Sequence, residues 1–475
     1  MTLLTRGEMH EFAAADQRFV YLVPSAAVFK LDAVSGAILD TLGERVLTPD
    51  QLVDSLTERY GLDHVRATIG ELHAVRAISD AGEFQDDQVV QMPPEGFPLT
   101  TMVMNVTSKC NLACTYCYEY GDDRINESAC GDQPDFMSEE TARQSVDFMF
   151  RESGDNKVAH LNFFGGETLM NFKVLQDSVA YARERAAALG KEVQFGLTTN
   201  ATLLKPQIIE WLAENRVGVT VSIDGPQDEQ DEFRVFKNGR GSYDVVVPKI
   251  KELLQKHRTR PIGARVTLTK QNLNVHKIFR HLTEDLGFWE VGFAPVTTSS
   301  IRDYAIEDEG FNAMLDQFTG LAYEWLEQTA NNQHHAFSNV RDTIEEIHKG
   351  VSKAFPCGAG LGLVGVGTGG DVALCHRFAG SDEHSMGSVA DGIDRTQQQT
   401  FLESHHIDNK PDCQTCFARP LCSGGCYHEA HTRYGATTTA NLHYCEWIRT
   451  WTATCLEVYG EIAERNPGYL AQFEN

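Results

Sequence analysis

The sequence predicts an α/β protein: a partial (β/α)6 barrel of the TIM type, with a small N-terminal winged-helix domain and a C-terminal cysteine-rich domain. Six apolar runs alternate with helical patterns in the middle of the chain, and most of the twelve cysteines follow residue 350. The expected boundaries are 1–95 for the winged-helix domain, 96–300 for the barrel, 301–350 for a helical bridge and 351–475 for the cysteine-rich domain.

The first block reads as two strands, at residues 19–23 and 27–31, followed by helical patterns at 34–42, 48–60 and 64–78. Thr48 and Pro49 suit a helix cap and first turn, and a turn-rich linker closes the block at residues 92–96. Strands followed by short helices favour a winged-helix unit. DNA binding is disfavoured because the helices carry Asp50, Asp54, Glu58, Asp63 and Glu71.

In the middle block, strands are expected at residues 101–106, 160–164, 193–198, 217–223, 263–268 and 290–294, with helices between them. Barrels of this kind place their chemistry at the carboxyl ends of the strands. The polar motifs that follow these strands are therefore expected to meet in one site.

The first of these motifs is a C-x3-C-x2-C triplet formed by Cys110, Cys114 and Cys117. Three thiolates can hold three irons of a four-iron cluster and leave the fourth iron open to a ligand. A zinc site is the alternative, but it needs a fourth nearby ligand, and the next cysteine, Cys130, lies in a polar, acidic stretch.

Later strands end in Gly165-Gly166-Glu167, in Thr198-Thr199-Asn200 and in Ser222-Ile-Asp224, and Arg234 follows. Each motif alone commonly forms a cap, a turn or a surface ion pair. Their order at successive strand ends favours a shared ligand site.

The cysteine triplet resembles the signature of radical SAM enzymes, in which an open 4Fe-4S cluster chelates S-adenosylmethionine and cleaves it to a 5'-deoxyadenosyl radical. The resemblance implies that the Gly-Gly-Glu turn holds the methionyl amine, although Thr168 replaces the usual proline, and that Arg234 and Ser222 hold the carboxylate. The polar end of the third strand would face the ribose, and Tyr116 and Tyr118 would shield the cluster. The cofactor-binding residues expected are Tyr116, Gly165, Gly166, Glu167, Thr198, Asn200, Ser222, Asp224 and Arg234.

The last block resembles the seven-cysteine SPASM signature, with Cys357 and Cys375 around a glycine-rich stretch and a C-x2-C-x5-C-x3-C run before Cys445. The resemblance implies two auxiliary 4Fe-4S clusters, and hence three clusters in all. Two complete clusters need eight ligands, so one is expected to have a non-cysteine or open position. Cys455 could supply the missing ligand, but it is expected to be a core residue of the terminal helix. The implied inner, incomplete set is Cys357, Cys375 and Cys426, and the outer set is Cys413, Cys416, Cys422 and Cys445. Two structural zinc sites are the alternative.

A G-x-G-x-x-G pattern at residues 360–365 is interpreted as a hairpin with a turn at 368–371, because no helix is expected after it. Residues 297–352 are expected to be largely helical, with His334, His335 and His348 at the surface.

Composition narrows the function classes. The chain of 475 residues is 42% hydrophobic, which suffices for several cores, and it has no apolar run long enough for a membrane span. Clustered cysteines without an export signal favour metal ligation in the cytoplasm over disulfides. The net charge of −26 disfavours nucleic acid as a partner.

These resemblances imply a radical SAM enzyme of the SPASM subfamily that modifies a peptide or small protein, with flavodoxin or ferredoxin as electron donor. The N-terminal unit resembles peptide-recognition domains, in which the peptide adds as a strand to the wing edge. Residues 114–121 and the overall length are similar to the maturation proteins of quinohemoprotein amine dehydrogenase. That similarity implies thioether cross-links between cysteine and aspartate or glutamate, and His376 is the candidate acid/base.

Two other interpretations stay open. Sulfatase-maturing enzymes share the clusters but, by resemblance, carry an acid after the cysteine that corresponds to Cys375, where this chain has His376. A zinc-binding scaffold would use the cysteines without catalysis.

Overall fold

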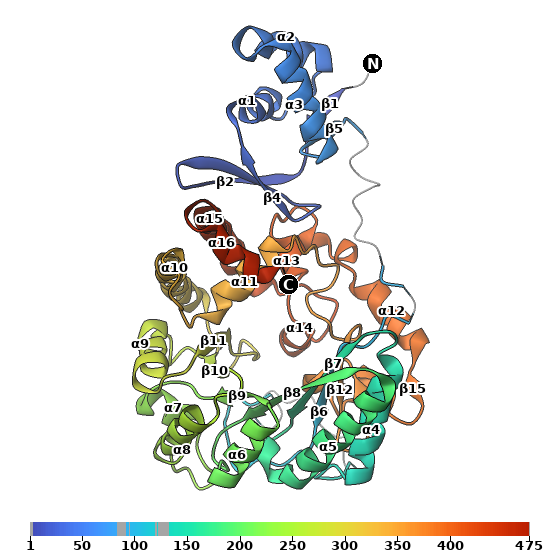
Figure 1. Ribbon diagram of the computed structural model, residues 1–475, viewed down its shortest axis with the longest axis vertical. Helices are drawn as coiled ribbons and strands as arrows, with labels where there is room; N and C mark the ends of the chain where they lie inside the picture. The colour runs from blue at the N-terminus through green and yellow to red at the C-terminus, as the bar shows by residue number, and fades with distance from the viewer. Residues whose placement is uncertain (1–2, 83–91, 95, 119–120, 122–132, 475) are drawn as a thin grey trace.

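The computed structural model describes residues 3–82, 92–94, 96–118, 121 and 133–474. Cys130 and residues 119–120 of the motif at 114–121 therefore lie outside the described residues. Six parallel strands form the centre of the molecule and are neighbours in chain order, which confirms the predicted barrel strands (Figure 1). They are β6 (Thr101–Asn105), β7 (Val158–Phe164), β8 (Glu192–Thr199), β9 (Gly218–Ser222), β10 (Ile262–Leu268) and β11 (Glu290–Pro295).

Helices cover the outer face of this sheet (Figure 1). They are α4 (Glu139–Glu152), α5 (Phe172–Leu189), α6 (Pro206–Glu214), α7 (Gln227–Phe233), α8 (Tyr243–Lys256) and α9 (Val275–Arg280). Side chains alternate along each strand, so the buried residues of β10 pack toward the helices, while Arg265 and Thr267 line a cavity inside the barrel. The outward set is Ile262, Ala264, Val266 and Leu268.

Glycines occupy inward positions on four neighbouring strands: Gly196, Gly218, Gly263 and Gly292. Large branched side chains usually fill the axis of a (β/α) barrel. Glycines in their place leave room along the axis of this one.

A C-terminal hairpin extends the barrel sheet beyond β6. As predicted, the glycine-rich stretch forms two antiparallel strands, β12 (Leu363–Val366) and β13 (Asp371–Ala373), followed by β14 (Ser385–Ser388) and β15 (Gly392–Ile393). Strand β12 pairs in parallel with β6, and the Thr100 hydroxyl donates to the carbonyl of Gly362 at 2.8 Å. This pairing brings the cysteine-rich segment beside the strand ends of the barrel.

The N-terminal unit has its own hydrophobic core. It comprises β1 (Leu4–Arg6), β2 (Met9–Ala14), β3 (Gln17–Leu22), β4 (Ala27–Leu31), α1 (Ala33–Leu42), α2 (Pro49–Tyr60), α3 (Leu62–Ala74) and β5 (Ile78–Asp80). The predicted cap is present, because Thr48 and Gln51 form a reciprocal capping box at the start of α2. Strands β1, β2 and β5 were not predicted from the sequence.

The remaining α-helices of the described residues are α10 (Asp308–Ala330), α11 (Ser338–His348), α12 (Arg395–His405), α13 (Arg419–Cys422), α14 (Tyr427–Tyr434), α15 (Cys445–Arg465) and α16 (Pro467–Leu470). Of these, α15 contacts β2 and α11 contacts β4 of the N-terminal unit. Figure 1 shows the N-terminal unit resting against this helical layer. Gly460 of α15 leaves space for Phe12 and Ala14 of β2, and Lys30 pairs with Glu464 at 2.9 Å.

Two expectations about single residues have clear outcomes. Cys455 is fully buried in the main core, as expected of a helix-core cysteine. The expectation that His335 lies at the surface is wrong, because its ring is buried and stacks on Phe279.

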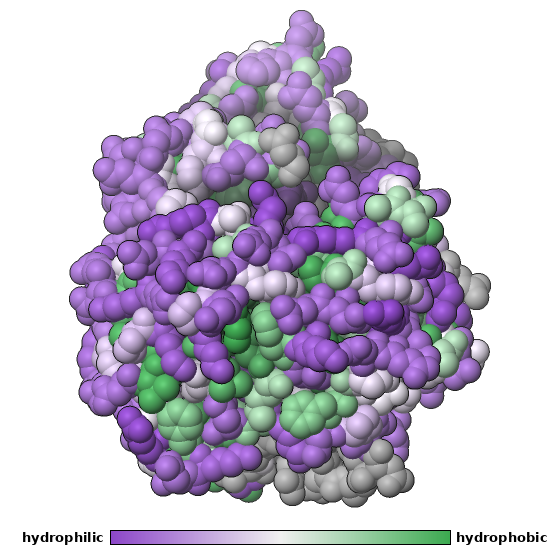
Figure 2. Space-filling view, turned by 60° about the horizontal axis from the view of Figure 1, so that its bottom comes forward, coloured by the Kyte–Doolittle hydropathy of each residue, from purple (hydrophilic) through white to green (hydrophobic). Residues whose placement is uncertain are grey.

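Hydrophilic side chains cover most of the face seen in Figure 2, with hydrophobic ones grouped in its lower half. No helix among the described residues is both long and apolar enough to cross a membrane.

Candidate active site

A cavity of about 490 Å³ opens at the carboxyl ends of the barrel strands. It gathers the predicted cysteine triplet, the predicted cofactor residues other than Asp224, and the candidate acid/base. Its lining includes Cys110, Cys114, Tyr116, Cys117, Tyr118, Phe164, Gly165, Gly166, Glu167, Thr198, Thr199, Asn200, Thr220, Ser222, Arg234, Arg265, Thr267, Thr297, His376 and Arg377.

The three cysteines follow β6 on a loop that reaches into this cavity. Asn200 holds the loop, because its amide donates to Cys110 Sγ at 3.7 Å and to the side-chain oxygen of Asn111 at 3.1 Å. Burial raises the pKa of Cys114 to about 12, although the nearby charge of Arg234 opposes the shift. A buried thiol is inert unless a metal removes its proton, so the triplet suits metal ligation.

The two glycines of the Gly-Gly-Glu turn admit the backbone of the cysteine loop. A Cβ at Gly165 would lie 2.4 Å from the carbonyl oxygen of Thr107, and one at Gly166 would lie 2.2 Å from that of Lys109. The backbone N–H of Glu167 donates to the Lys109 carbonyl at 2.8 Å. The end of β7 therefore fixes the position of the cysteines.

Glu167 is buried, and three donors hold its carboxylate. Oε1 accepts from the Thr199 hydroxyl at 2.7 Å and from the Leu169 N–H at 3.1 Å, and Oε2 accepts from the Asn200 N–H at 2.8 Å. Burial nevertheless raises the pKa of Glu167. Oε2 keeps acceptor capacity for an ammonium group that enters the cavity.

Thr168 stands where the resemblance expects proline. Its hydroxyl donates to the carbonyl of Thr198 at 2.8 Å. This bond ties the ends of β7 and β8 together, which gives the turn a restraint of a different kind from a proline ring.

Asp224 is fully buried and is not among the cavity-lining residues. Its Oδ2 accepts from Arg234 Nε at 2.9 Å and from the Tyr116 hydroxyl, and its Oδ1 accepts from the Thr267 N–H at 3.0 Å. Arg234 also lies over the Tyr116 ring, 5.5 Å from its centre, which is within the limit of about 6 Å for a cation–π contact. Asp224 thus positions two residues that do face the cavity.

His376 and Arg377 enter the cavity from the hairpin side, directly after Cys375. Asn105 at the end of β6 donates to the His376 carbonyl at 3.1 Å and fixes the segment. Burial and the charge of Arg377 lower the pKa of His376 to about 3, so its imidazole is neutral.

The predicted outer cysteine set comes together around one small pocket. Cys413, Cys416, Cys422 and Cys445 all line it. Burial raises the pKa of Cys422 to about 12. Four convergent thiols fit an iron-sulfur cluster or a structural zinc ion equally well.

The predicted inner set also lies close together, because Cys357, Cys375 and Cys426 influence one another electrostatically. Burial and then the charge of Cys426 raise the pKa of Cys375 to about 12. The buried Lys410 lies near cysteines of both sets, which lower the cost of burying its charge. A buried ammonium group among thiols suits a cysteine site that carries negative charge.

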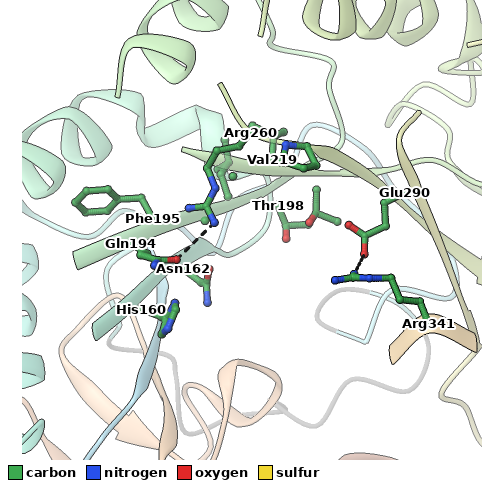
Figure 3. Close-up of a pocket in the computed structure, with 14 residues that line it drawn as sticks. His160, Asn162, Gln194, Phe195, Thr198, Val219, Arg260, Glu290 and Arg341 are labelled. Carbon is green, nitrogen blue, oxygen red and sulfur yellow. Dashed lines mark hydrogen bonds and ion pairs between the residues drawn. The ribbon is translucent and has the colours of Figure 1, made fainter. Parts of the chain in front are cut away.

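A second cavity of about 420 Å³ lies at the opposite end of the barrel strands (Figure 3). Arg260 extends toward Gln194 there, and Arg341 pairs with Glu290 at 3.6 Å. Thr198 and Thr220 line both cavities, so the two cavities approach each other along the glycine-lined axis.

Comparison with known proteins adds the family. Residues 104–280 match the model of the radical SAM superfamily. These residues form a radical SAM domain. Proteins of this family use S-adenosylmethionine and a 4Fe-4S cluster, and the thiol triplet beside the Glu167 turn fits that pair of cofactors.

Two relatives of this chain are anaerobic sulfatase-maturating enzymes. The serine-type enzyme of Bacteroides thetaiotaomicron is 29% identical over 242 residues, which cover 49% of this chain and 56% of that protein. The cysteine-type enzyme of Clostridium novyi is 22% identical over 370 residues, which cover 74% of this chain and 94% of that protein.

Solved structures share the fold. The enzyme anSMEcpe with bound AdoMet superposes with a TM-score of 0.63 at 20% identity, covering 80% of this chain and all of that one. Streptococcus suis SuiB bound to its precursor peptide SuiA gives a TM-score of 0.51 at 13% identity, covering 92% and 98% of the two chains.

Several cavity residues were missed from the sequence, and two of them are charged. Arg265 lies inside strand β10, and Arg377 follows a cysteine of the inner set. An inward-facing arginine in an otherwise apolar strand was the available signal for Arg265.

Proposed function

We propose that this protein is a radical SAM enzyme that modifies a peptide or small protein subunit by forming thioether cross-links between cysteine and aspartate or glutamate side chains. The observation that carries the proposal is a cavity lined by the thiol triplet after β6 and by His376, which directly follows Cys375 of the inner set. An inner site with three cysteines leaves a position at which a substrate thiolate can bind.

We assign the inner set, the outer set and the triplet to three 4Fe-4S clusters. When bound at the triplet, the cluster and S-adenosylmethionine supply a radical that removes a hydrogen atom from an unactivated carbon. Glu167 would receive the methionyl amine, and Thr198, Asn200, Ser222 and Arg234 would surround the rest of the cofactor. His376 faces the cavity, and we propose on its position alone that it receives the thiol proton.

The proposed reaction joins sulfur to carbon and removes two hydrogens per bridge. One leaves the carbon as a hydrogen atom, and the other leaves the thiol as a proton. One electron remains, and the sites at the inner and outer cysteines would accept it, with flavodoxin or ferredoxin as the external donor that starts the reaction.

Peptide recognition is proposed for the N-terminal unit. Strand β4 lies at one edge of a three-stranded sheet, in the order β2-β3-β4, and the other edge strand, β2, contacts α15. Phe29 of β4 is 37% exposed. An apolar side chain on a strand edge suits a peptide that adds as a further strand. SuiB, whose fold is similar, is known in complex with a precursor peptide.

A second candidate is the maturation of a sulfatase by oxidation of one cysteine or serine. The two sulfatase-maturating relatives favour it, and anSMEcpe is known with bound peptides. Against it stands His376, at the position where that resemblance implies an acid.

The mass of the product separates the candidates. Cross-linked peptide should be lighter by two hydrogens per bridge, should resist thiol alkylation and should stay intact under reductants that open disulfides. Alkylatable thiols that return on reduction would contradict the thioether proposal. An aldehyde on one cysteine or serine would support the sulfatase-type reaction instead.

A further inference from the structure

Two arginines that no motif includes face the cavity from different parts of the chain. Arg265 belongs to β10 and is level with Ser222, its Cα partner in β9. Arg377 follows the hairpin; its Nη1 donates to the Thr297 hydroxyl at 2.9 Å, and its guanidinium lies 5.0 Å from the centre of the Tyr118 ring.

Neither arginine forms an ion pair within 4.0 Å of a carboxylate in the described part of the chain. Arg234 differs, because Asp224 neutralises it at 2.9 Å. The accessible surface of Arg265 faces the cavity inside the barrel. Because the guanidinium lies within the barrel, burial lowers its pKa, and the charge of Arg377 lowers it further. Asp342 opposes that shift.

Gly292 leaves space for the Arg265 side chain. A Cβ at Gly292 of the neighbouring strand would lie 3.1 Å from Arg265 Nη1 and 2.9 Å from the Ser338 hydroxyl. The glycine therefore lets the guanidinium lie inside the barrel wall.

We propose that Arg265 and Arg377 form a carboxylate-binding subsite and that the substrate places an aspartate or glutamate side chain there. A guanidinium group offers a planar fork of donors that matches a carboxylate, and an anion between two like charges removes their repulsion. The hydroxyls of Thr267 and Thr297 also line the cavity and can hydrogen-bond to the bound acid.

The cofactor also carries a carboxylate, but the fold favours the substrate as the ligand of this pair. Glu167, the group expected to receive the cofactor amine, ends β7, and Arg265 lies three strands away on β10. Arg377 lies on the side of the inner cysteines, since Cys426 and Cys375 act on its charge. The subsite therefore extends from Arg265, beside Ser222 at the edge of the cofactor region, toward the cysteines proposed to bind the substrate thiolate.

This inference rests on the proposed function, since it assumes a peptide substrate. The test uses the anaerobically reconstituted full chain with S-adenosylmethionine and two acetylated, amidated peptides, Cys-Ala-Ala-Glu and Cys-Ala-Ala-Gln. Titration calorimetry should show the glutamate peptide binding about tenfold more tightly than the glutamine peptide.

Arg265→Gln and Arg377→Gln should each remove most of this preference, and Arg265→Lys should restore part of it. Arg260→Gln is the matched control, because Arg260 lines the opposite cavity and should keep the preference. Iron content and S-adenosylmethionine affinity, measured on every variant, should stay unchanged and show that the proteins are folded.

Equal affinity for the two peptides in the unaltered enzyme would overturn the inference. So would a loss of S-adenosylmethionine affinity in Arg265→Gln with the acid preference intact, which would assign Arg265 to the cofactor. Binding is measured without turnover, so a selective enzyme that forms no thioether would contradict the proposed function and leave the subsite standing.

Discussion

At the scale of single residues, the cysteines at this site depend on neighbours that carry no chemistry. The loop that holds them passes so close to the end of β7 that only glycine fits at residues 165 and 166. The Gly-Gly-Glu motif thus combines a packing requirement in its glycines with a ligand function expected of its carboxylate.

Gly166→Ala tests this packing requirement. The added Cβ would lie 2.2 Å from the Lys109 carbonyl oxygen and 3.0 Å from the Cys110 N–H nitrogen, both in the backbone, so the cysteine loop must move. Iron analysis should show a loss of about four irons per chain, and S-adenosylmethionine cleavage should fall at least about a hundredfold.

Gly70→Ala is the matched control, since nothing lies within 4 Å of its added Cβ. If Gly166→Ala kept its iron and its cleavage activity, the loop would have more freedom than these distances allow.

At the scale of elements, local patterns predicted more than long-range pairing. The six barrel strands, the helix cap at Thr48 and the hairpin followed from periodicity and turn residues within short windows. The parallel pairing of β12 with β6 joins residues more than 250 positions apart, as in the bond from Thr100 to Gly362, and no local pattern contains that information.

The candidate active site shows the same difference between local patterns and long-range contacts. The cysteine triplet and most of the outer set follow from local motif spacing, and the inner set was grouped by its resemblance to the SPASM signature. Arg265 and Arg377, in contrast, reach one cavity only through the fold of the barrel and the hairpin. The sequence predicts a surface position for His335, as for His334 and His348. In the structure, it packs beneath helix α10 next to Phe279 instead.

The burial of His335 predicts a pH dependence of stability. Its side chain is 2% exposed, its Nδ1 accepts from the Phe337 N–H at 3.3 Å, and its Nε2 lies 3.9 Å from Glu324 Oε2. Burial, followed by the charges of Arg280 and His334, lowers its pKa from 6.5 to about 4. Between these two values the unfolded chain binds more protons than the folded one, so stability falls as the pH drops from 6.5 to 4, by up to about 3 kcal/mol.

His335→Asn removes the titrating group, and its side-chain oxygen can still accept from the N–H two residues further on. The thermal midpoint of the full chain should therefore fall less between pH 7 and pH 4.5 in the variant than in the unaltered protein. An equal fall in both proteins would show that His335 does not contribute to this slope.

At the scale of the whole molecule, the proposed recognition of the peptide and the proposed chemistry lie in different units. The sheet with β4 belongs to the N-terminal unit, whose core is separate from that of the barrel. Peptide binding and cofactor cleavage should therefore respond to different substitutions.

Phe29→Glu should impair peptide binding and leave cofactor cleavage unchanged. A charge at this exposed position on β4 disfavours an apolar contact with an added strand, so peptide affinity should drop about tenfold or more. Cleavage of S-adenosylmethionine without peptide should stay as it is. Val46→Glu, at a position 46% exposed, is the control, and equal peptide affinity in both variants would exclude the β4 edge as the binding surface.

The pairing of β6 with β12 also sets an order of events during synthesis. The first barrel strand, which leads into the cysteine triplet, has one edge without its partner until residues 363–366 have left the ribosome. Such late, long-range contacts slow folding and leave strand edges open to aggregation. We therefore expect metal to bind at the triplet after translation has finished, when β12 has paired with β6. When iron is scarce during rapid expression, chains without metal should keep this strand edge open for longer and accumulate as insoluble protein.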